Sequence, residues 1–116
     1  KYGFDVLAIR IGNVAERPVD RRRLTSWLSP RDLAQLVRIG VETPRLGYEV
    51  VFGMSRNTGS CWVNNAAYRL GYAPQDDAMS HVDRIDTAPP DPDDPAQVYQ
   101  GGPFVLAETG GDPWKR

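Results

Sequence analysis

The stretch FDVLAIRI, residues 4–11, is the part of this 116-residue sequence that most directly indicates the fold. It is short, almost continuously apolar and rich in Val and Ile, and Gly12 and Asn13 follow it. Such a run is typical of a strand in a parallel sheet that is covered on both faces. One further segment, YEVVFGM at residues 48–54, reads as a parallel neighbour. The sequence therefore predicts an α/β fold that holds only part of a larger sheet.

A helix is predicted between these two strands. Ser29 is suited to cap its N-terminus, Pro30 to occupy its first position, and the acidic Asp32 follows three residues after the cap. Pro44 disfavours helical geometry in the residue before it, so the helix should end near Glu42. The apolar stripe predicted to be buried consists of Leu33, Leu36, Val37 and Gly40.

The remaining sequence divides into two parts. Residues 62–70 read as a short amphipathic helix that completes a first part, residues 1–86, which contains both strands. Residues 87–116 begin with TAPPDPDDP, which has too many prolines and aspartates for a helix or a central strand. We expect this second part to be an extended, Pro/Asp-rich C-terminal arm.

Charge is balanced overall but not locally. The chain has 14 basic and 15 acidic residues, so it lacks the basic excess of a general nucleic-acid or anionic-membrane binder. Residues 10–45 hold eight arginines against four acidic residues, whereas residues 83–97 hold five aspartates and one arginine. This asymmetry favours a small anionic ligand over a polyanion.

Several kinds of chemistry have no support in the sequence. The lone Cys61 allows no disulfide within the chain, and no Cys/His set has the spacing of a zinc site, which together fit a reducing, cytoplasmic setting. No apolar run approaches the roughly 18 residues of a membrane-spanning helix. His81 is interpreted as an ordinary surface residue, and the adjacent carboxylates Asp76 and Asp77 as solvated rather than as an acid/base pair.

The end of the first strand is the predicted location of a ligand site. In open α/β sheets, ligands bind beyond the carboxyl ends of the strands, which here means Gly12 and Asn13. The Asn13 amide can donate to and accept from a hydroxyl or an amide. Satisfying the backbone groups of a turn is an equally good explanation of this asparagine.

The three consecutive arginines, Arg21, Arg22 and Arg23, are the second candidate feature. If the segment is extended, the middle side chain points opposite to its neighbours, so Arg22 would face inward. Its guanidinium would then suit a carboxylate or a phosphate. A solvated run with an ion pair to Asp20 is the alternative.

Four segments give the chain a resemblance to a known family. They are LTSWLSPRDLAQLV at residues 24–37, GYEVVFGMSRNTGSCWVNN at 47–65, RLGYAPQDDA at 69–78 and QGGPF at 100–104. On these segments the chain resembles the C-terminal half of extended short-chain dehydrogenases, the NAD-dependent epimerase/dehydratase group, and within that group it is most similar to the uronate dehydrogenases. The resemblance implies the C-terminal part of a Rossmann-type, doubly wound parallel sheet with its small substrate-binding lobe, which residues 1–86 would contain.

The resemblance also implies an activity and its partners. A member would oxidise the anomeric carbon of a hexuronate to an aldarolactone and pass hydride to NAD, with a sugar acid as substrate and a homo-oligomeric state. In the family, the Gly-rich turn, the Ser and the Tyr-x-x-x-Lys helix perform cofactor binding and proton transfer. None of these maps to this chain, so no catalytic residue is predicted here and the chain alone is expected to be inactive.

Residue by residue, the resemblance transfers five candidates. Ile11, Gly12 and Asn13 match the strand end that passes the nicotinamide, with Asn13 also at a substrate-hydroxyl position where the family carries Ser. Arg22 matches the arginine that grips the uronate carboxylate, and Phe104 matches an aromatic residue of the tail near the substrate pocket.

Two other functions stay open at this point. One is a sugar-nucleotide epimerase or dehydratase in which an arginine of the loop holds a diphosphate; the short span before Ser29 argues against it. The other is a non-catalytic α/β interaction module that binds protein through the arginine loop and the Pro/Asp-rich arm.

Overall fold

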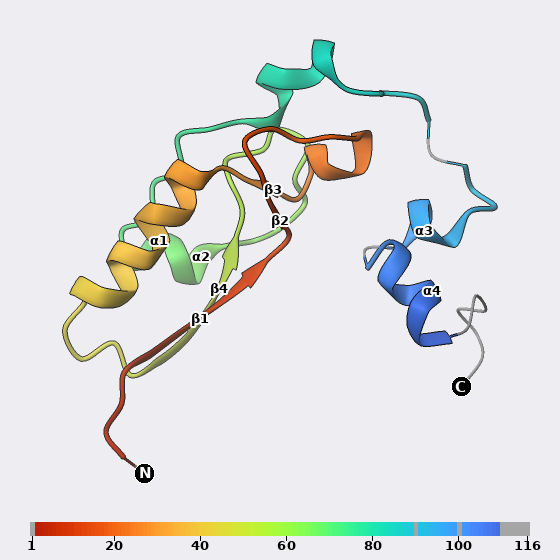
Figure 1. Ribbon diagram of the computed structural model, residues 1–116. Coiled ribbons are helices and arrows are strands. Elements are labelled where there is room, and N and C mark those ends of the chain that lie inside the picture. Colours follow the sequence, from red (N-terminus) through yellow and green to blue (C-terminus); the bar gives the residue numbers. More distant parts are fainter. Residues whose placement is uncertain (1, 90, 100, 110–116) are drawn as a thin grey trace. The chain divides into compact units, whose positions relative to one another are not determined.

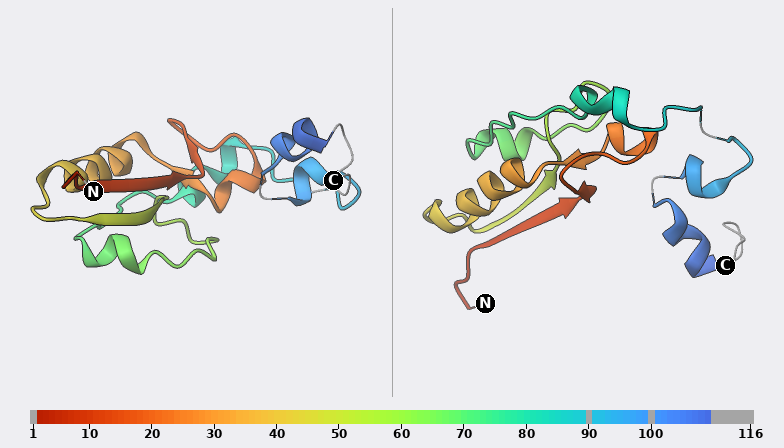
Figure 2. Two further views of the ribbon diagram at one scale, coloured as in Figure 1. Left: turned by 90° about the horizontal axis from the view of Figure 1, so that it is seen from below. Right: turned by 45° about the horizontal axis from the view of Figure 1, so that its top comes forward.

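The computed structural model describes residues 2–89, 91–99 and 101–109, which form two compact units, Lys1–Asp86 and Thr87–Arg116 (Figure 1). In the first unit, β1 (Val6–Ile11) and β4 (Tyr48–Gly53) form a parallel pair in which Ile9 lies opposite Val51. Figure 2 shows the two strands side by side and pointing in the same direction. The predicted parallel arrangement of the two apolar segments is therefore confirmed.

Helix α1 (Pro30–Glu42) crosses from one strand to the other and begins and ends as its sequence predicts. Ser29 is its N-cap and accepts a hydrogen bond from the Asp32 N–H, while Pro30 occupies the first turn. After Glu42 the chain reverses through Arg45, whose φ is 54°, into β4. This strand–helix–strand connection is the basic unit of doubly wound α/β folds.

The buried stripe of α1 differs from the prediction at Val37. Leu36 is buried, but Val37 is 50% exposed, and Ile39 packs against the core in its place. Gly40 faces β1, where an added Cβ would lie 3.1 Å from the Leu7 side chain. The helix therefore packs on the strand along the side that carries Leu36 and Gly40, and Val37 lies beyond the edge of this narrow contact.

The core lies on one side of the strand pair. A buried cluster joins Leu36 of α1, Val51 of β4, Ala67 of α2 (Asn65–Arg69) and Tyr72. Helix α2 is shorter than the predicted range 62–70. Its start is delayed because the Asn64 side chain bonds the backbone of Phe52 in β4, accepting from its N–H at 3.0 Å and donating to its carbonyl at 2.8 Å.

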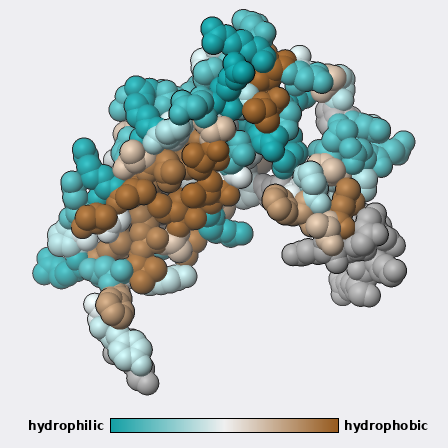
Figure 3. All heavy atoms as spheres, viewed as in Figure 1, coloured by the Kyte–Doolittle hydropathy of each residue, from teal (hydrophilic) through white to brown (hydrophobic). Residues whose placement is uncertain are grey.

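The other side of the strand pair is open in this unit. Side chains alternate along a strand, so Val6, Tyr48 and Val50 point away from the core cluster, and they are 40%, 72% and 41% exposed. Figure 3 shows hydrophobic residues gathered over the part of the molecule that contains β1, β4 and α1.

A second, smaller parallel pair follows the ends of the main strands. It consists of β2 (Asn13–Val14) and β3 (Trp27–Leu28), with Asn13 opposite Trp27. Two 3₁₀ helices complete the unit: η1 (Arg21–Leu24) and η2 (Ala78–Arg84). Trp27 and Leu28 are almost fully buried, as expected for anchors of the helix that follows them.

The second unit is more helical than the extended arm that the sequence predicts. It contains α3 (Pro95–Val98) and α4 (Pro103–Thr109), which contact each other. Asp94 caps α3 by accepting a hydrogen bond from the Ala96 N–H, and Pro95 occupies the first turn. The prolines thus start short helices here instead of preventing them. No helix in the described ranges is long and apolar enough to cross a membrane.

Candidate functional site

The carboxyl end of β1 approaches the segment before β3 very closely at Gly12. A Cβ built on Gly12 would lie 2.3 Å from the Ser26 carbonyl oxygen and 2.9 Å from the Ser26 Cβ. No side chain fits at such distances. Glycine therefore allows the end of β1 to pack directly on Ser26.

Asn13 carries an unsatisfied polar atom at this strand end. Its backbone N–H donates to the Ser26 carbonyl at 3.1 Å. The Asn13 Oδ1 atom is buried, and no hydrogen-bond partner for it exists among the described residues. A buried carbonyl without a donor is costly, so this oxygen is suited to accept from a hydroxyl or amide group of a ligand.

The arginine segment is a helical turn and not the extended chain that the sequence analysis assumes. Asp20 caps η1 by accepting from the Arg23 N–H at 2.9 Å, and it also forms an ion pair with the Arg23 guanidinium. The prediction that the three arginine side chains alternate as they would in a strand is therefore wrong. Arg21 is nevertheless exposed and Arg22 half-buried. The ion pair to Asp20 involves Arg23, whose buried Nε lacks a partner in the described ranges.

Trp27 connects the two candidate features. Its indole N–H donates to the Ala15 carbonyl at 2.7 Å, and its backbone pairs with Asn13 across β2 and β3. The arginine turn ends three residues before Trp27, and Thr25 fastens it by donating from its hydroxyl to the Arg22 carbonyl at 3.0 Å. Asn13 pairs with Trp27, and the arginine turn shortly precedes Trp27 in the sequence, so both candidate features are linked to this buried residue.

His81 is part of this packing and is not the plain surface residue expected from the sequence. It is half-buried, and its ring lies edge-on to the Trp27 ring with centroids 5.3 Å apart. Cys61 is exposed, and no group of His, Cys, Asp and Glu side chains in the described ranges could hold a metal ion.

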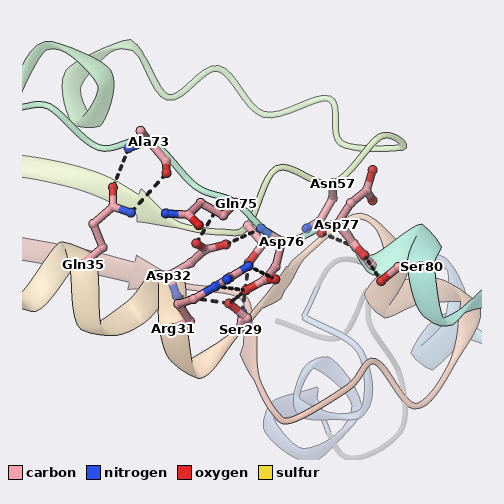
Figure 4. Close-up of polar contacts among 12 residues, drawn as sticks. Ser29, Arg31, Asp32, Gln35, Asn57, Ala73, Gln75, Asp76, Asp77 and Ser80 are labelled. Carbon is pink, nitrogen blue, oxygen red and sulfur yellow. Dashed lines mark hydrogen bonds and ion pairs between the residues drawn. The ribbon is translucent and has the colours of Figure 1, made fainter.

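A polar network at the start of α1 fixes the segment that leads to η2 (Figure 4). The fully buried Asp32 accepts from the N–H groups of Gln75 at 2.9 Å and Asp76 at 3.1 Å. Asp76 in turn accepts from the Ser29 hydroxyl at 2.6 Å and from Arg31 Nε at 3.1 Å. The predicted solvation of Asp76 is wrong, because this carboxylate is held by three hydrogen bonds.

The neighbouring Asp77 is held in the same way. It caps η2 by accepting from the Met79 N–H at 3.0 Å, and it binds both the backbone and the hydroxyl of Thr58. Partial burial would raise its pKa, but the hydrogen bonds from Thr58 and Met79 outweigh that effect and lower the pKa. Both carboxylates therefore serve the structure of this segment, and neither is placed as a general base.

The hydrogen bonds to Asp76 make the stability of the chain dependent on pH. Hydrogen bonds from Arg31 and then Ser29 lower the Asp76 pKa in the folded state. The carboxylate therefore stabilises the fold above its unfolded pKa of about 3.9, and this contribution is lost as the pH falls through the lower folded pKa.

We expect Asp76→Asn to reduce the free energy of unfolding by about 1–2 kcal/mol at pH 6 and by less at pH 3. Asp83→Asn, which removes an exposed carboxylate near the end of η2, is the control. Urea unfolding at the two pH values measures the difference. An equal loss at pH 3 and pH 6 would contradict this role for the ionised carboxylate.

A pocket of about 130 Å³ lies beside the end of β4. None of the site residues predicted from the sequence lines it. Phe104, the remaining candidate, lies on α4 in the second unit and is 80% exposed. The residues that line this pocket are Phe52, Met54, Ser55, Arg56, Asn57, Ser60, Trp62, Asn64 and Tyr68.

The predicted site residues divide between the two units. Ile11, Gly12, Asn13 and Arg22 lie in the first unit, and Phe104 lies in the second.

The parallel strands, the connecting helix and the polar strand end define part of a Rossmann-type α/β fold. The chain matches a glucuronic acid dehydrogenase from Chromohalobacter salexigens at 41% identity with a TM-score of 0.83, covering 91% of this chain and 41% of that one. It matches a uronate dehydrogenase from Agrobacterium tumefaciens, a mutant complexed with NAD, at 34% identity with a TM-score of 0.83, covering 100% of this chain and 43% of that one.

Curated sequences agree with the solved structures. A uronate dehydrogenase from Pseudomonas syringae pv. tomato is 42% identical over 113 residues, which are 97% of this chain and 41% of that protein. One from Pseudomonas putida is 41% identical over 92% of this chain and 40% of that protein. No family model matches the sequence. The chain is similar to the C-terminal part of these uronate dehydrogenases, and it spans about 40% of their length.

Proposed function

We propose that this chain supplies the substrate-binding part of an NAD-dependent uronate dehydrogenase, which oxidises the anomeric carbon of a hexuronate to an aldarolactone. The similarity to uronate dehydrogenases carries the proposal, and the arrangement of two polar residues supports it. The chain is 36–42% identical to three uronate dehydrogenases along 90–97% of its length. It also places a half-buried arginine and an unsatisfied carbonyl in adjoining segments, which suits a ligand with both a carboxylate and hydroxyl groups.

Arg22 is the proposed carboxylate clamp. A guanidinium offers two parallel N–H donors that match the two oxygens of a carboxylate. Arg22 is the arginine that the resemblance assigns to this role, and it is half-buried whereas Arg21 is exposed. A neutral sugar would leave this cation without its anionic partner, at a cost of ~2–5 kcal/mol. The contact that binds an acid sugar would therefore also reject a neutral one.

Asn13 is proposed to accept a hydrogen bond from a substrate hydroxyl or from the cofactor amide. Its buried, unpaired Oδ1 fits either donor. Ile11, which is 47% exposed at the end of β1, is proposed to offer an apolar surface to the nicotinamide ring. Bound NAD would supply the hydride acceptor for the oxidation. The close packing on Ser26 accounts for a glycine at position 12, and the backbone of Gly12 stays proposed as a contact of the nicotinamide.

The remaining predictions rest on the resemblance. Phe104 as a substrate-pocket aromatic, the homo-oligomeric state and the cytoplasmic location stay predictions of this proposal. The sugar-nucleotide enzyme and the non-catalytic module are less favoured, because the relatives that the comparisons name are uronate or glucuronic acid dehydrogenases.

A chimeric enzyme tests the proposed function. In it, this chain replaces the matching C-terminal part of the Pseudomonas syringae relative, which is 42% identical to it. We expect NADH to form with galacturonate or glucuronate and not with galactose or a UDP-sugar. The unmodified relative is the positive control, and its N-terminal part alone is the negative control. A chimera that folds and binds NAD but oxidises no uronate would contradict the proposal.

A further inference from the structure

Two buried asparagines in the first unit have matching environments. Asn57 and Asn64 are each 6% exposed, and each side chain donates one hydrogen bond to a backbone carbonyl and accepts one from a backbone N–H. They differ in what they hold. Asn64 bonds the outer edge of β4 at Phe52, whereas Asn57 bonds the segment that carries the candidate site.

Asn57 links two segments that are far apart in the sequence. Its Nδ2 donates to the Trp27 carbonyl at 2.8 Å, and its Oδ1 accepts from the Ala78 N–H at 3.1 Å. The Ser55 N–H donates to the same Trp27 carbonyl at 2.9 Å. The end of β4 therefore fixes the position of Trp27 through two hydrogen bonds, and only one of them comes from a side chain.

Trp27 passes this constraint to the site. Its backbone lies opposite Asn13, and its indole N–H holds the Ala15 carbonyl, so it contacts β2 and the residue directly after it. The arginine turn lies just before Trp27 in the sequence. A displacement of Trp27 would move Asn13 and Arg22 relative to each other. Site geometry is sensitive to such shifts, because a misplacement of about 1 Å can cost about 100-fold in rate.

We infer that Asn57 is a positioning residue for the hexuronate: through Trp27 it sets the distance between the Asn13 carbonyl and the Arg22 guanidinium, and so contributes to substrate specificity. This inference rests on the proposed function. Asn57 contacts backbone groups only, so it touches neither substrate nor cofactor.

The first test compares Asn57→Asp with Asn64→Asp in the chimera. Each change keeps an oxygen that can accept from an N–H but removes the donor and places a carboxylate near a carbonyl. We expect both variants to lose similar thermal stability. Only Asn57→Asp should raise the KM for galacturonate, by about tenfold or more, with the KM for NAD changed less than threefold. Asn57→Ser keeps a smaller hydrogen-bond donor and should give an intermediate KM for galacturonate. This variant also tests the inference if Asn57→Asp does not fold.

The second test needs no enzyme activity. In the isolated chain, hydrogen exchange of the Trp27 indole N–H, identified by its loss in Trp27→Phe, reports whether Trp27 still holds Ala15. We expect Asn57→Asp to accelerate this exchange about tenfold relative to Asn64→Asp. Equal exchange in the two variants, together with equal KM values, would overturn the inference. A chimera without uronate oxidation, with exchange that still responds to Asn57, would instead reject the proposed function alone.

Discussion

Methionine in place of Arg22 should raise the KM of the chimera for galacturonate by about 100-fold or more, and leave the KM for NAD within about twofold. Methionine keeps much of the apolar length of the arginine side chain, so packing in the turn changes little. The loss is that of a bidentate, charge-assisted contact that a carboxylate would make with the half-buried guanidinium. Steady-state NADH kinetics with each substrate varied in turn measures both constants.

Arg21→Met is the matched control for this prediction. It removes the same charge from the same 3₁₀ turn, but the side chain of Arg21 is exposed. We expect less than a threefold change in the KM for galacturonate, because an exposed charge is screened by salt. Equal increases in the two variants would show that the turn acts through its total charge, and Arg22 would then not be the clamp.

Local patterns in the sequence predict the parts of the fold that local physics determines. The cap at Ser29, the first-turn proline and the end of α1 near Glu42 are examples, and the structure confirms all three. Each of them depends only on residues within about one helical turn of its own position. The prediction that the arginine segment is extended is wrong, although the sequence contains a local signal against it. Asp20 lies three residues before Arg23, which is the spacing of a cap that starts a helical turn.

Long-range contacts account for the other differences. Helix α2 begins late because Asn64 bonds Phe52, twelve residues earlier in the sequence. Asp76 accepts a hydrogen bond from Ser29, which is 47 residues away. The neighbouring aspartates Asp76 and Asp77 in the sequence therefore give no indication of this contact. The same applies to the site. The rule for strand ends indicates Gly12 and Asn13, but it cannot indicate that Asn57 holds the Trp27 backbone beside them.

Alanine at Gly12 should lower the free energy of unfolding by about 2–3 kcal/mol, which is a large part of the stability of a small domain. The added Cβ would meet the backbone carbonyl of Ser26 at 2.3 Å, so the end of β1 or the segment before β3 must move. Gly59→Ala is the control, because its nearest neighbour, the Thr25 side chain, lies at an ordinary contact distance of 3.7 Å. Urea unfolding of both variants measures the difference.

The outcome at Gly12 also separates two reasons for a glycine at this strand end. If close packing on Ser26 is the reason, the alanine variant loses stability, and its KM for galacturonate rises in the chimera because Asn13 moves with the strand end. If the glycine instead makes room for the nicotinamide, stability should stay near that of the Gly59 variant and the KM for NAD should rise. The 2.3 Å approach to a backbone atom favours the first result, since backbone yields less readily than the end of a side chain.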